Sequence, residues 1–340
     1  MKVIKIAKMG FQLPVKNPFI VCFHHKDHFP KGNGKMEPAH YLESRRIGED
    51  FDHNAPWRMY YGDTIPGFPV HPHRGFETIT VVTEGFADHF DSKGSHGRYG
   101  QGDVQWMTAG AGIQHSEMFP VLSETKDNPM ELFQIWLNLP RKDKFAKPDY
   151  KMLWHEQIPI AKIDDENSNT SLVKVIAGSC YGVKSPDPLP ASWAYDRNNK
   201  VNIWLIMMNP NAELTIPKVS ASTGRMLYFY EGNKADIEGQ GMEVDHFAEL
   251  DGNEDILIRN GDTESRLLLL EGEPIRESVA TYGPFVMNTR DEIEQAISDY
   301  EQTQFGGWQW DSPGPVNKRN DGRFASYNNG ERIEKPEDFT

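Results

Sequence analysis

The sequence predicts an all-β protein with two domains, on three observations. Its apolar stretches are short and rich in β-branched or aromatic residues, as at positions 20–23, 78–82, 132–137, 172–176, 201–206 and 226–230. The 29 glycines and 23 prolines place turn signals between these stretches, and many short strands separated by turns are typical of a β-sandwich or barrel. A chain of 340 residues is also long enough for two hydrophobic cores at about 150 residues per domain.

A weak internal repeat supports two copies of one strand-rich unit. The stretch Val81–Asp88 resembles Tyr228–Asp236, with the dipeptide Glu-Gly at the centre of both. The expected linker is the polar stretch Asp164–Thr170 or the turns just before it. We therefore predict an N-terminal domain over 1–150, a second domain over 151–287, and a C-terminal helix with an extended tail over 288–340.

The helix is predicted from capping and periodicity. Thr289 and Glu292 have the spacing of a capping box, and apolar residues follow at i, i+3, i+4 and i+7 (Ile293, Ala296, Ile297 and Tyr300). This apolar face should pack onto a barrel. Beyond Gly306 the tail is rich in Gly, Pro, Asn and charge, and we expect Trp308 and Trp310 to dock there.

Composition excludes several classes of protein. The net charge of −14 argues against general nucleic-acid binding, which needs clustered Lys and Arg, although a protein that itself holds DNA could still be a partner. Cys22 and Cys180 form neither a disulfide framework nor a Cys-based zinc site, and Cys22 is expected to be buried. No apolar run reaches the roughly 20 residues of a membrane helix. Lysines interrupt positions 1–8, so no secretory signal is expected and the predicted location is cytoplasmic.

Two pairs of polar residues with i, i+2 spacing indicate a metal site. His71 and His73 form one pair, and His115 and Glu117 form the other. In a strand such residues point to the same face, so two adjacent strands would bring four donors together. Three imidazoles and a carboxylate suit iron, with two octahedral positions left for substrate, water or O₂, although Mn, Co, Ni, Cu or Zn would also bind. A single pair could equally be solvated or hydrogen-bonded; two pairs flanked by glycine turns favour the metal site.

Glu77 is the alternative carboxylate ligand. On a straight strand its Cα would lie roughly 13 Å from that of His73, whereas Glu117 is two residues from His115, so Glu117 is preferred. The other histidines have simpler interpretations. A pocket mouth could be lined by His24, His25 and His28, whereas surface or hydrogen-bonded positions are expected for His53, His89 and His96. No pattern includes His40 or His155. In the second half Lys218 and Ser220 stand where the repeat would place the first pair, and only His155 and His246 supply imidazoles, so that half is expected to be metal-free.

Four motifs resemble the pirin family of the cupin superfamily: His71–Thr78, Gly102–Gly110, Gly112–Met118 and Gly283–Asn288. The resemblance runs from about Pro18 to Gly306 and does not extend to the tail. It implies a bicupin, with two β-barrel (cupin) domains, an iron site in the N-terminal barrel and a C-terminal helix packed back on it. It also implies that the iron ligands are His71, His73, His115 and Glu117.

The resemblance implies two kinds of role, and the cupin fold adds a third. The first is quercetin 2,3-dioxygenase-like opening of a flavonol ring with O₂, in which Glu117 could accept the hydroxyl proton. Phe76, Trp106 and Met107 could then pack the planar rings, although each is more simply core. The second is a non-catalytic, iron-dependent redox sensor that binds a transcription factor or a metabolic enzyme. A small-molecule isomerase is the third and weakest.

Overall fold

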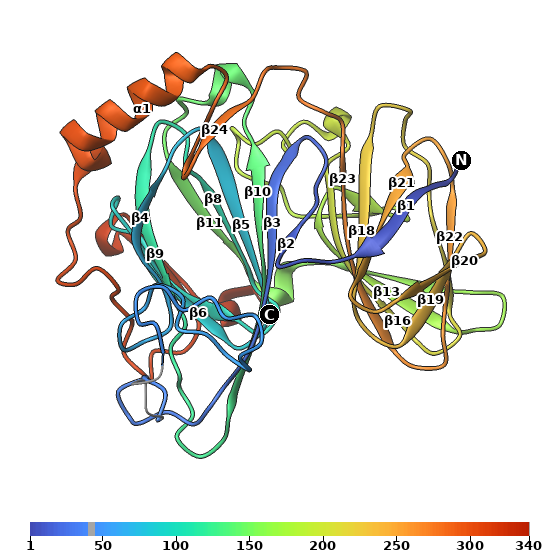
Figure 1. Ribbon diagram of the computed structural model, residues 1–340, viewed down its shortest axis with the longest axis horizontal. Coiled ribbons are helices and arrows are strands. Elements are labelled where there is room, and N and C mark those ends of the chain that lie inside the picture. Colours follow the sequence, from blue (N-terminus) through green and yellow to red (C-terminus); the bar gives the residue numbers. More distant parts are fainter. Residues whose placement is uncertain (40–44, 340) are drawn as a thin grey trace. The chain divides into compact units, whose positions relative to one another are not determined.

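The computed structural model describes residues 1–39 and 45–339 and confirms the all-β prediction (Figure 1). All six apolar stretches noted above lie in strands. The chain divides into two compact units, and each combines two separate segments. Unit 1 contains residues 1–22 and 157–276, and unit 2 contains residues 23–156 and 277–340.

This division differs from the continuous segments 1–150, 151–287 and 288–340. The N-terminal strand β1 (Val3–Lys8) pairs with β21 (His246–Asp251) inside unit 1. Of the two expected linker positions, Asp164–Thr170 is wrong, because it forms the turn of a hairpin between β12 (Ile160–Asp164) and β13 (Thr170–Ala177). The other position, the turns just before it, contains a boundary between the units. The chain passes between the units at Glu156–Gln157, in the turns just before that hairpin.

Unit 1 is a barrel filled with apolar side chains. Its core joins residues from two sheets, such as Trp204 and Leu227 from one and Leu214 and Ile258 from the other. The larger sheet has the order β1-β21-β18-β23-β16-β13-β12 and the smaller one β17-β22-β19-β20. The remaining strands of unit 1 are β2 (Gln12–Leu13), β14 (Ser179–Cys180), β15 (Val183–Lys184), β16 (Asn202–Met208), β17 (Glu213–Ile216), β18 (Gly224–Glu231), β19 (Lys234–Ile237), β20 (Gln240–Glu243), β22 (Ile256–Asn260) and β23 (Ser265–Gly272).

Unit 2 contains the histidine pairs. One sheet has the order β27-β26-β7-β6-β9-β4, and the other contains β11-β8-β5-β10-β3. A small hairpin, β24-β25, precedes α1 (Arg290–Thr303). The strands are β3 (Phe19–Phe29), β4 (Gly67–His73), β5 (Phe76–Glu84), β6 (Phe86–Asp91), β7 (His96–Gly100), β8 (Val104–Thr108), β9 (Ile113–Met118), β10 (Asn128–Asn138), β11 (Asp149–Leu153), β24 (Ala280–Tyr282), β25 (Phe285–Met287), β26 (Phe324–Tyr327) and β27 (Arg332–Glu334).

The two stretches of the internal repeat adopt the same local structure. Glu84-Gly85 joins β5 to β6, and Glu231-Gly232 joins β18 to β19. Both glycines have positive φ, of 78° and 135°, a region that residues with a Cβ rarely adopt. Cys22 is buried, as expected; Cys180 is buried too, and both are free. No helix in the described part of the chain is long and apolar enough to cross a membrane.

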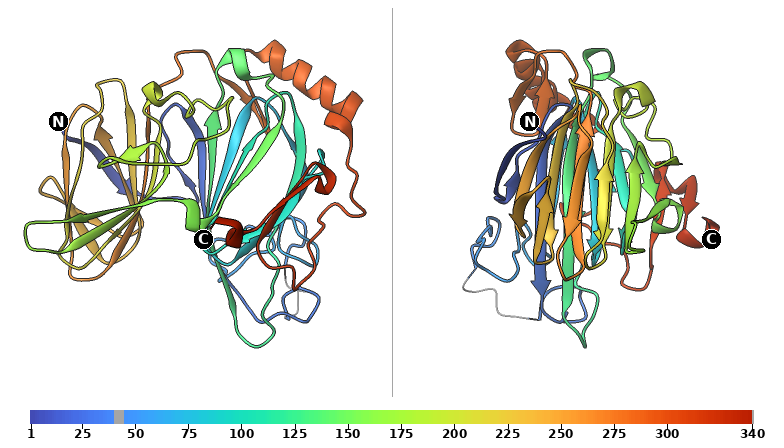
Figure 2. Two further views of the ribbon diagram at one scale, coloured as in Figure 1. Left: turned by 180° about the vertical axis from the view of Figure 1, so that it is seen from behind. Right: turned by 90° about the vertical axis from the view of Figure 1, so that its right-hand side faces the viewer.

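The tail adds two strands to unit 2. β26 pairs with β7 and β27 pairs with β26 (Figure 2). Asn317 anchors this addition, because its backbone N–H donates to Asp88 at 2.7 Å. Trp310 docks as predicted: its Nε1 donates to the Asp91 carbonyl at 2.8 Å and its ring contacts Phe90. The Trp308 indole donates within the tail instead, to the Ser312 carbonyl.

The capping box at the start of α1 is confirmed and gives a first prediction. The Thr289 hydroxyl accepts from the Glu292 N–H at 3.2 Å, and the Glu292 carboxylate accepts from the Thr289 N–H at 3.0 Å. Thr289→Ala should lower the free energy of unfolding by about 1 kcal/mol, because one helical N–H loses its acceptor. Chemical denaturation measures this change. Thr289→Ser, which retains the hydroxyl, should behave like the wild type, and an equal loss in both variants would contradict the assignment.

Candidate metal centre

The histidines converge because β4 and β9 are adjacent antiparallel strands. His71 lies directly opposite His115 in the pairing, and His73 lies opposite Ile113. A β-bulge between Phe68 and His71 shifts the register of β4 just before the first pair. The possible ligand atoms of His71, His73 and His115 all lie within 4.8 Å of one another. Their ring centroids are 4.4–4.9 Å apart.

Burial keeps these imidazoles in the neutral form that binds metals. His115 is fully buried and His73 is 3% exposed. Burial lowers the pKa of His71, and it lowers the pKa of His73 and of His115 well below the usual value, assisted by the neighbouring imidazoles. At neutral pH each ring therefore has a nitrogen lone pair available for a cation.

The hydrogen bonds of the rings fit a metal ion. The Nδ1 of His71 donates to the Pro69 carbonyl at 2.8 Å, and the Nδ1 of His73 lies 3.4 Å from the Pro284 carbonyl, so in each ring Nε2 would be the atom available to a metal. Both ring nitrogens of His115 are buried without a hydrogen-bond partner in the described chain. A buried polar atom left in this state costs about 1–3 kcal/mol, and a bond to a metal at one nitrogen would remove part of that cost.

Glu117 is held by donors from other strands. Its Oε1 lies 2.8 Å from the Thr80 hydroxyl and 3.2 Å from the Tyr99 hydroxyl, and its Oε2 accepts from Gln134 Nε2 at 2.5 Å. Burial and the nearby Glu117 raise the pKa of Tyr99 well above its usual value, so Tyr99 remains a donor. The bonds leave a lone pair on Oε2 for a cation or a proton. The alternative residue, Glu77, is fully buried and accepts from Thr108 at 2.7 Å.

His89 is a neighbour of the site that sequence reasoning missed. Of its two expected environments, a hydrogen bond is confirmed, since its Nε2 lies 3.2 Å from an Asp91 oxygen, and the surface is wrong, since the residue is fully buried. Its ring centroid lies 5.5 Å from that of His115. The available signal was the alternating pattern of residues 86–91, which predicts a strand. Placing His89 beside His115 also required knowing that this strand, β6, pairs with β9.

The remaining histidines have other environments. His24 Nε2 lies 3.1 Å from a Glu131 carboxylate oxygen and its ring stacks on Phe133, and His25 is buried against the Tyr60 hydroxyl. His96 bonds Asn317, whereas His53 and His28 are exposed. His40 lies outside the described residues.

Aromatic rings flank the histidine cluster. Phe76 lies 5.0 Å from His73 between ring centroids, and Trp136, which sequence reasoning did not select, lies 5.3 Å from His73. Trp106 and Met107 are fully buried, and Met107 packs with Ala109 and Ile113. Phe76 is fully buried as well, whereas Trp136 is half-buried.

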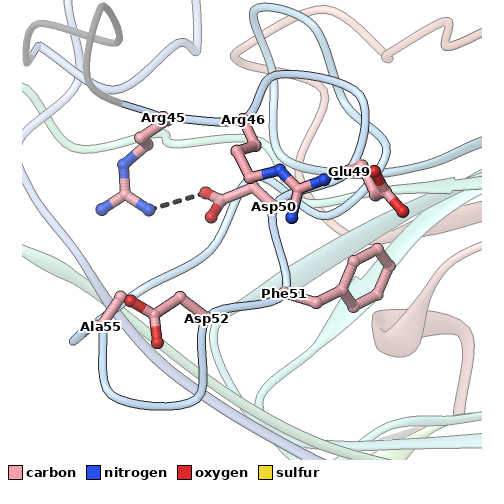
Figure 3. Close-up of a pocket in the computed structure, with 7 residues that line it drawn as sticks. All are labelled: Arg45, Arg46, Glu49, Asp50, Phe51, Asp52 and Ala55. Carbon is pink, nitrogen blue, oxygen red and sulfur yellow. Dashed lines mark hydrogen bonds and ion pairs between the residues drawn. The ribbon is translucent and has the colours of Figure 1, made fainter.

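A charged hollow is lined by Arg45, Arg46, Glu49, Asp50, Phe51, Asp52 and Ala55 (Figure 3). Its cavity volume is about 580 Å³, and Arg45 and Asp50 form an ion pair of 2.7 Å within it. Phe51, on its wall, lies 6.4 Å from the Phe68 ring, which in turn lies 6.5 Å from His71. Aromatic contacts thus connect the hollow to the histidines.

Lys144 braces the end of the β4 strand and gives a pH prediction. Its amino group donates to the carbonyls of Gly75 and Val286 and to Asn138, at 2.8–2.9 Å. Burial lowers its pKa to about 8, below the value of about 10.4 in an unfolded chain. The folded state therefore binds fewer protons between these values, and stability should rise with pH across that window.

The comparison that measures this effect uses Lys144→Met. Between pH 8 and 10 the free energy of unfolding of the wild type should rise relative to that of the variant, by on the order of 2 kcal/mol. Denaturant unfolding at several pH values gives both curves. Parallel curves would show that Lys144 has an ordinary pKa.

Comparisons with known proteins agree with this architecture. Residues 35–137 match the family model "Pirin", and residues 203–306 match "Pirin C-terminal cupin domain". A Pseudomonas aeruginosa protein named "Putative quercetin 2,3-dioxygenase" is 35% identical over 239 residues, which cover 70% of this chain and 79% of the relative. Human pirin is 36% identical over 252 residues, covering 73% and 80%. The crystal structure of quercetin 2,3-dioxygenase from Acinetobacter baumannii superposes with a TM-score of 0.70 at 24% identity, over 90% of this chain and 98% of the other.

Proposed function

Because the chain belongs to the pirin family, we propose that it binds one Fe(II) ion through His71, His73, His115 and Glu117 and uses O₂ to open the ring of a flavonol-type substrate. The observation that carries the proposal is the convergence of three neutral imidazoles, of which His73 and His115 are buried and His71 is half-buried; both nitrogens of His115 lack a hydrogen-bond partner in the described chain. Relatives whose names include quercetin 2,3-dioxygenase supply the substrate class.

The metal would supply Lewis acidity and a coordination position for the substrate oxygens. The residues of this chain would do the rest. Trp136, which is half-buried and packs on the buried Phe76, would contact the planar rings of the flavonol. Glu117 Oε2 would accept the proton of the flavonol hydroxyl group once the carboxylate has swung partly free of the metal. Thr80 and Tyr99 fix the other carboxylate oxygen, so the basic atom points in a defined direction.

The test is oxygen consumption by anaerobically purified protein loaded with Fe(II). Metal analysis comes first, because Mn, Co, Ni, Cu or Zn could occupy the same ligands. Quercetin should then cause oxygen uptake and yield a ring-opened product that contains ¹⁸O from ¹⁸O₂. The matching flavone without the 3-hydroxyl group should cause none. Bound iron without oxygen uptake would contradict the dioxygenase proposal.

A second candidate function is a non-catalytic, iron-dependent sensor that binds a protein partner. The observation that favours it is the rigid hold on Glu117, whose two oxygens have three donors from three different strands. Such a fixed carboxylate suits a permanent ligand better than a mobile base. The net charge of −14 would favour a protein partner over DNA. Capture of a partner that does not depend on the iron oxidation state would contradict this candidate.

A further inference from the structure

The C-terminal segment of unit 2 contacts the sequence neighbours of all four proposed ligands. We call residues 284–314 the C-terminal belt. The neighbours are Val70 before His71, Arg74 after His73, Gln114 before His115 and Met118 after Glu117. Because side chains alternate along a strand, residues next to an inward-pointing ligand point away from the metal centre. The belt therefore contacts the side of β4 and β9 that faces away from the proposed metal centre.

Arg74 makes the strongest of these contacts. Its Nη1 donates to Asp299 of α1 at 2.6 Å, and its Nε donates to the Ala111 carbonyl at 2.7 Å. The guanidinium group also lies over the Phe305 ring, 4.5 Å from the centroid. Arg74 is only 6% exposed, so this charge-assisted bond is shielded from solvent on one side and fixes the end of β4.

Gln114 provides the matching contact on β9. Its Nε2 donates to the Gln304 carbonyl at 2.7 Å, and its Oε1 accepts from the Tyr300 hydroxyl at 3.0 Å. Both groups of the amide are thus bound by the belt. Gly112, two residues earlier, allows Phe305 to approach, since a Cβ there would come within 2.7 Å of the Phe305 ring.

The two remaining contacts complete the pattern. The Val70 N–H donates to the Pro313 carbonyl at 2.7 Å. Gly314 packs against Met118, because a Cβ at Gly314 would lie 3.1 Å from its sulfur atom. In addition, Pro284 accepts directly from the His73 ring. Figure 1 shows the chain after α1 continuing along the side of unit 2 that contains β4 and β9.

We propose that the C-terminal belt positions the metal ligands, and that Asp299 and Tyr300 are positioning residues that act through Arg74 and Gln114 on His73 and His115. This inference rests on the proposed metal site. Ligands must be held to within about 0.5 Å of the productive geometry, and β4 is the edge strand of its six-stranded sheet, with a strand neighbour, β9, on one side. Bonds to the outward neighbours would restrict shifts of the ligands without touching the metal.

The test uses Asp299→Asn and Tyr300→Phe in the full chain, with Co(II) as the probe. Tyr300→Phe removes one hydroxyl and retains the ring, which packs near Phe285 and Phe305. The matched controls are Glu294→Gln, an exposed carboxylate of the same helix, and Tyr282→Phe, an exposed tyrosine. The readouts are the Co(II) Kd by chelator competition, the visible d–d spectrum, and the thermal midpoint of the metal-free protein.

The expected result is a Co(II) Kd raised roughly tenfold in each belt variant, with an altered d–d spectrum, and unchanged values in both controls. If the belt only stabilised the fold, the thermal midpoint of the metal-free protein would fall, and the Co(II) Kd and the d–d spectrum would stay as in the wild type. That result would overturn the inference but not the proposed metal site. Should the wild type bind no Co(II), the site and the inference would both be overturned.

Discussion

Replacing His115 with alanine should abolish metal binding and oxygen uptake together. His115 is the fully buried member of the cluster, and neither of its ring nitrogens has another partner in the described chain. Its loss leaves two imidazoles and one carboxylate. Because replacing even the hydrogen-bond partners of metal ligands lowers affinity by about 10–100-fold, loss of a ligand should cost at least about 100-fold.

Metal analysis after dialysis and a Co(II) titration measure this change. The control is His246→Ala in unit 1, where the imidazole bonds the Val244 carbonyl and lies outside the cluster. That variant should bind metal as the wild type does. If His115→Ala retained one tightly bound metal per chain, the ligand assignment would be wrong.

Glu117→Gln should separate metal binding from turnover. The substitution keeps the shape of the side chain and removes the base, so turnover with quercetin should fall by about 10²–10⁴-fold. The new amide would place an N–H₂ group opposite Gln134 Nε2, now 2.5 Å from Oε2. A flip of the Gln134 amide would restore both hydrogen bonds. Its oxygen would accept from the new amide, and its Nε2 would donate to the Thr80 hydroxyl, which can accept as well as donate. The structural cost should therefore be small.

Single-turnover oxygen uptake by iron-loaded protein measures this effect. Glu84→Gln, an exposed carboxylate at the end of β5, is the matched control and should retain full activity. Unchanged turnover in Glu117→Gln would exclude the base role and favour the sensor function. Loss of iron without any other change would identify Glu117 as a ligand only.

Local patterns predicted the elements well. Hydrophobic stretches located six strands, and the capping box of Thr289 and Glu292 located α1. The i, i+2 spacing predicted that His71 and His73 share one face of their strand and that His115 and Glu117 share one face of theirs, because alternation in a strand depends only on neighbouring residues. The Glu-Gly turns of the repeat were also recognisable, since a positive φ there favours glycine.

Strand partnership could not be predicted in the same way. β1 pairs with β21, and the tail strand β26 pairs with β7, so each unit combines segments that are distant in the sequence. The expected linker at Asp164–Thr170 was a hairpin turn, because polar turn residues are the same in a linker and in a hairpin.

The sequence by itself therefore determined the fold class, the family and the histidine pattern whose members His71, His73 and His115 converge, because these follow from local spacing and motif. Only the tertiary structure decided what surrounds them. Thr80, Tyr99 and Gln134 reach Glu117 from three strands, His89 lies beside His115, and the belt contacts the outer side of β4 and β9. The physical reason is that hydrogen bonds between sheet strands are made by backbone groups common to all residues, so strand order is set by the packing of the whole barrel.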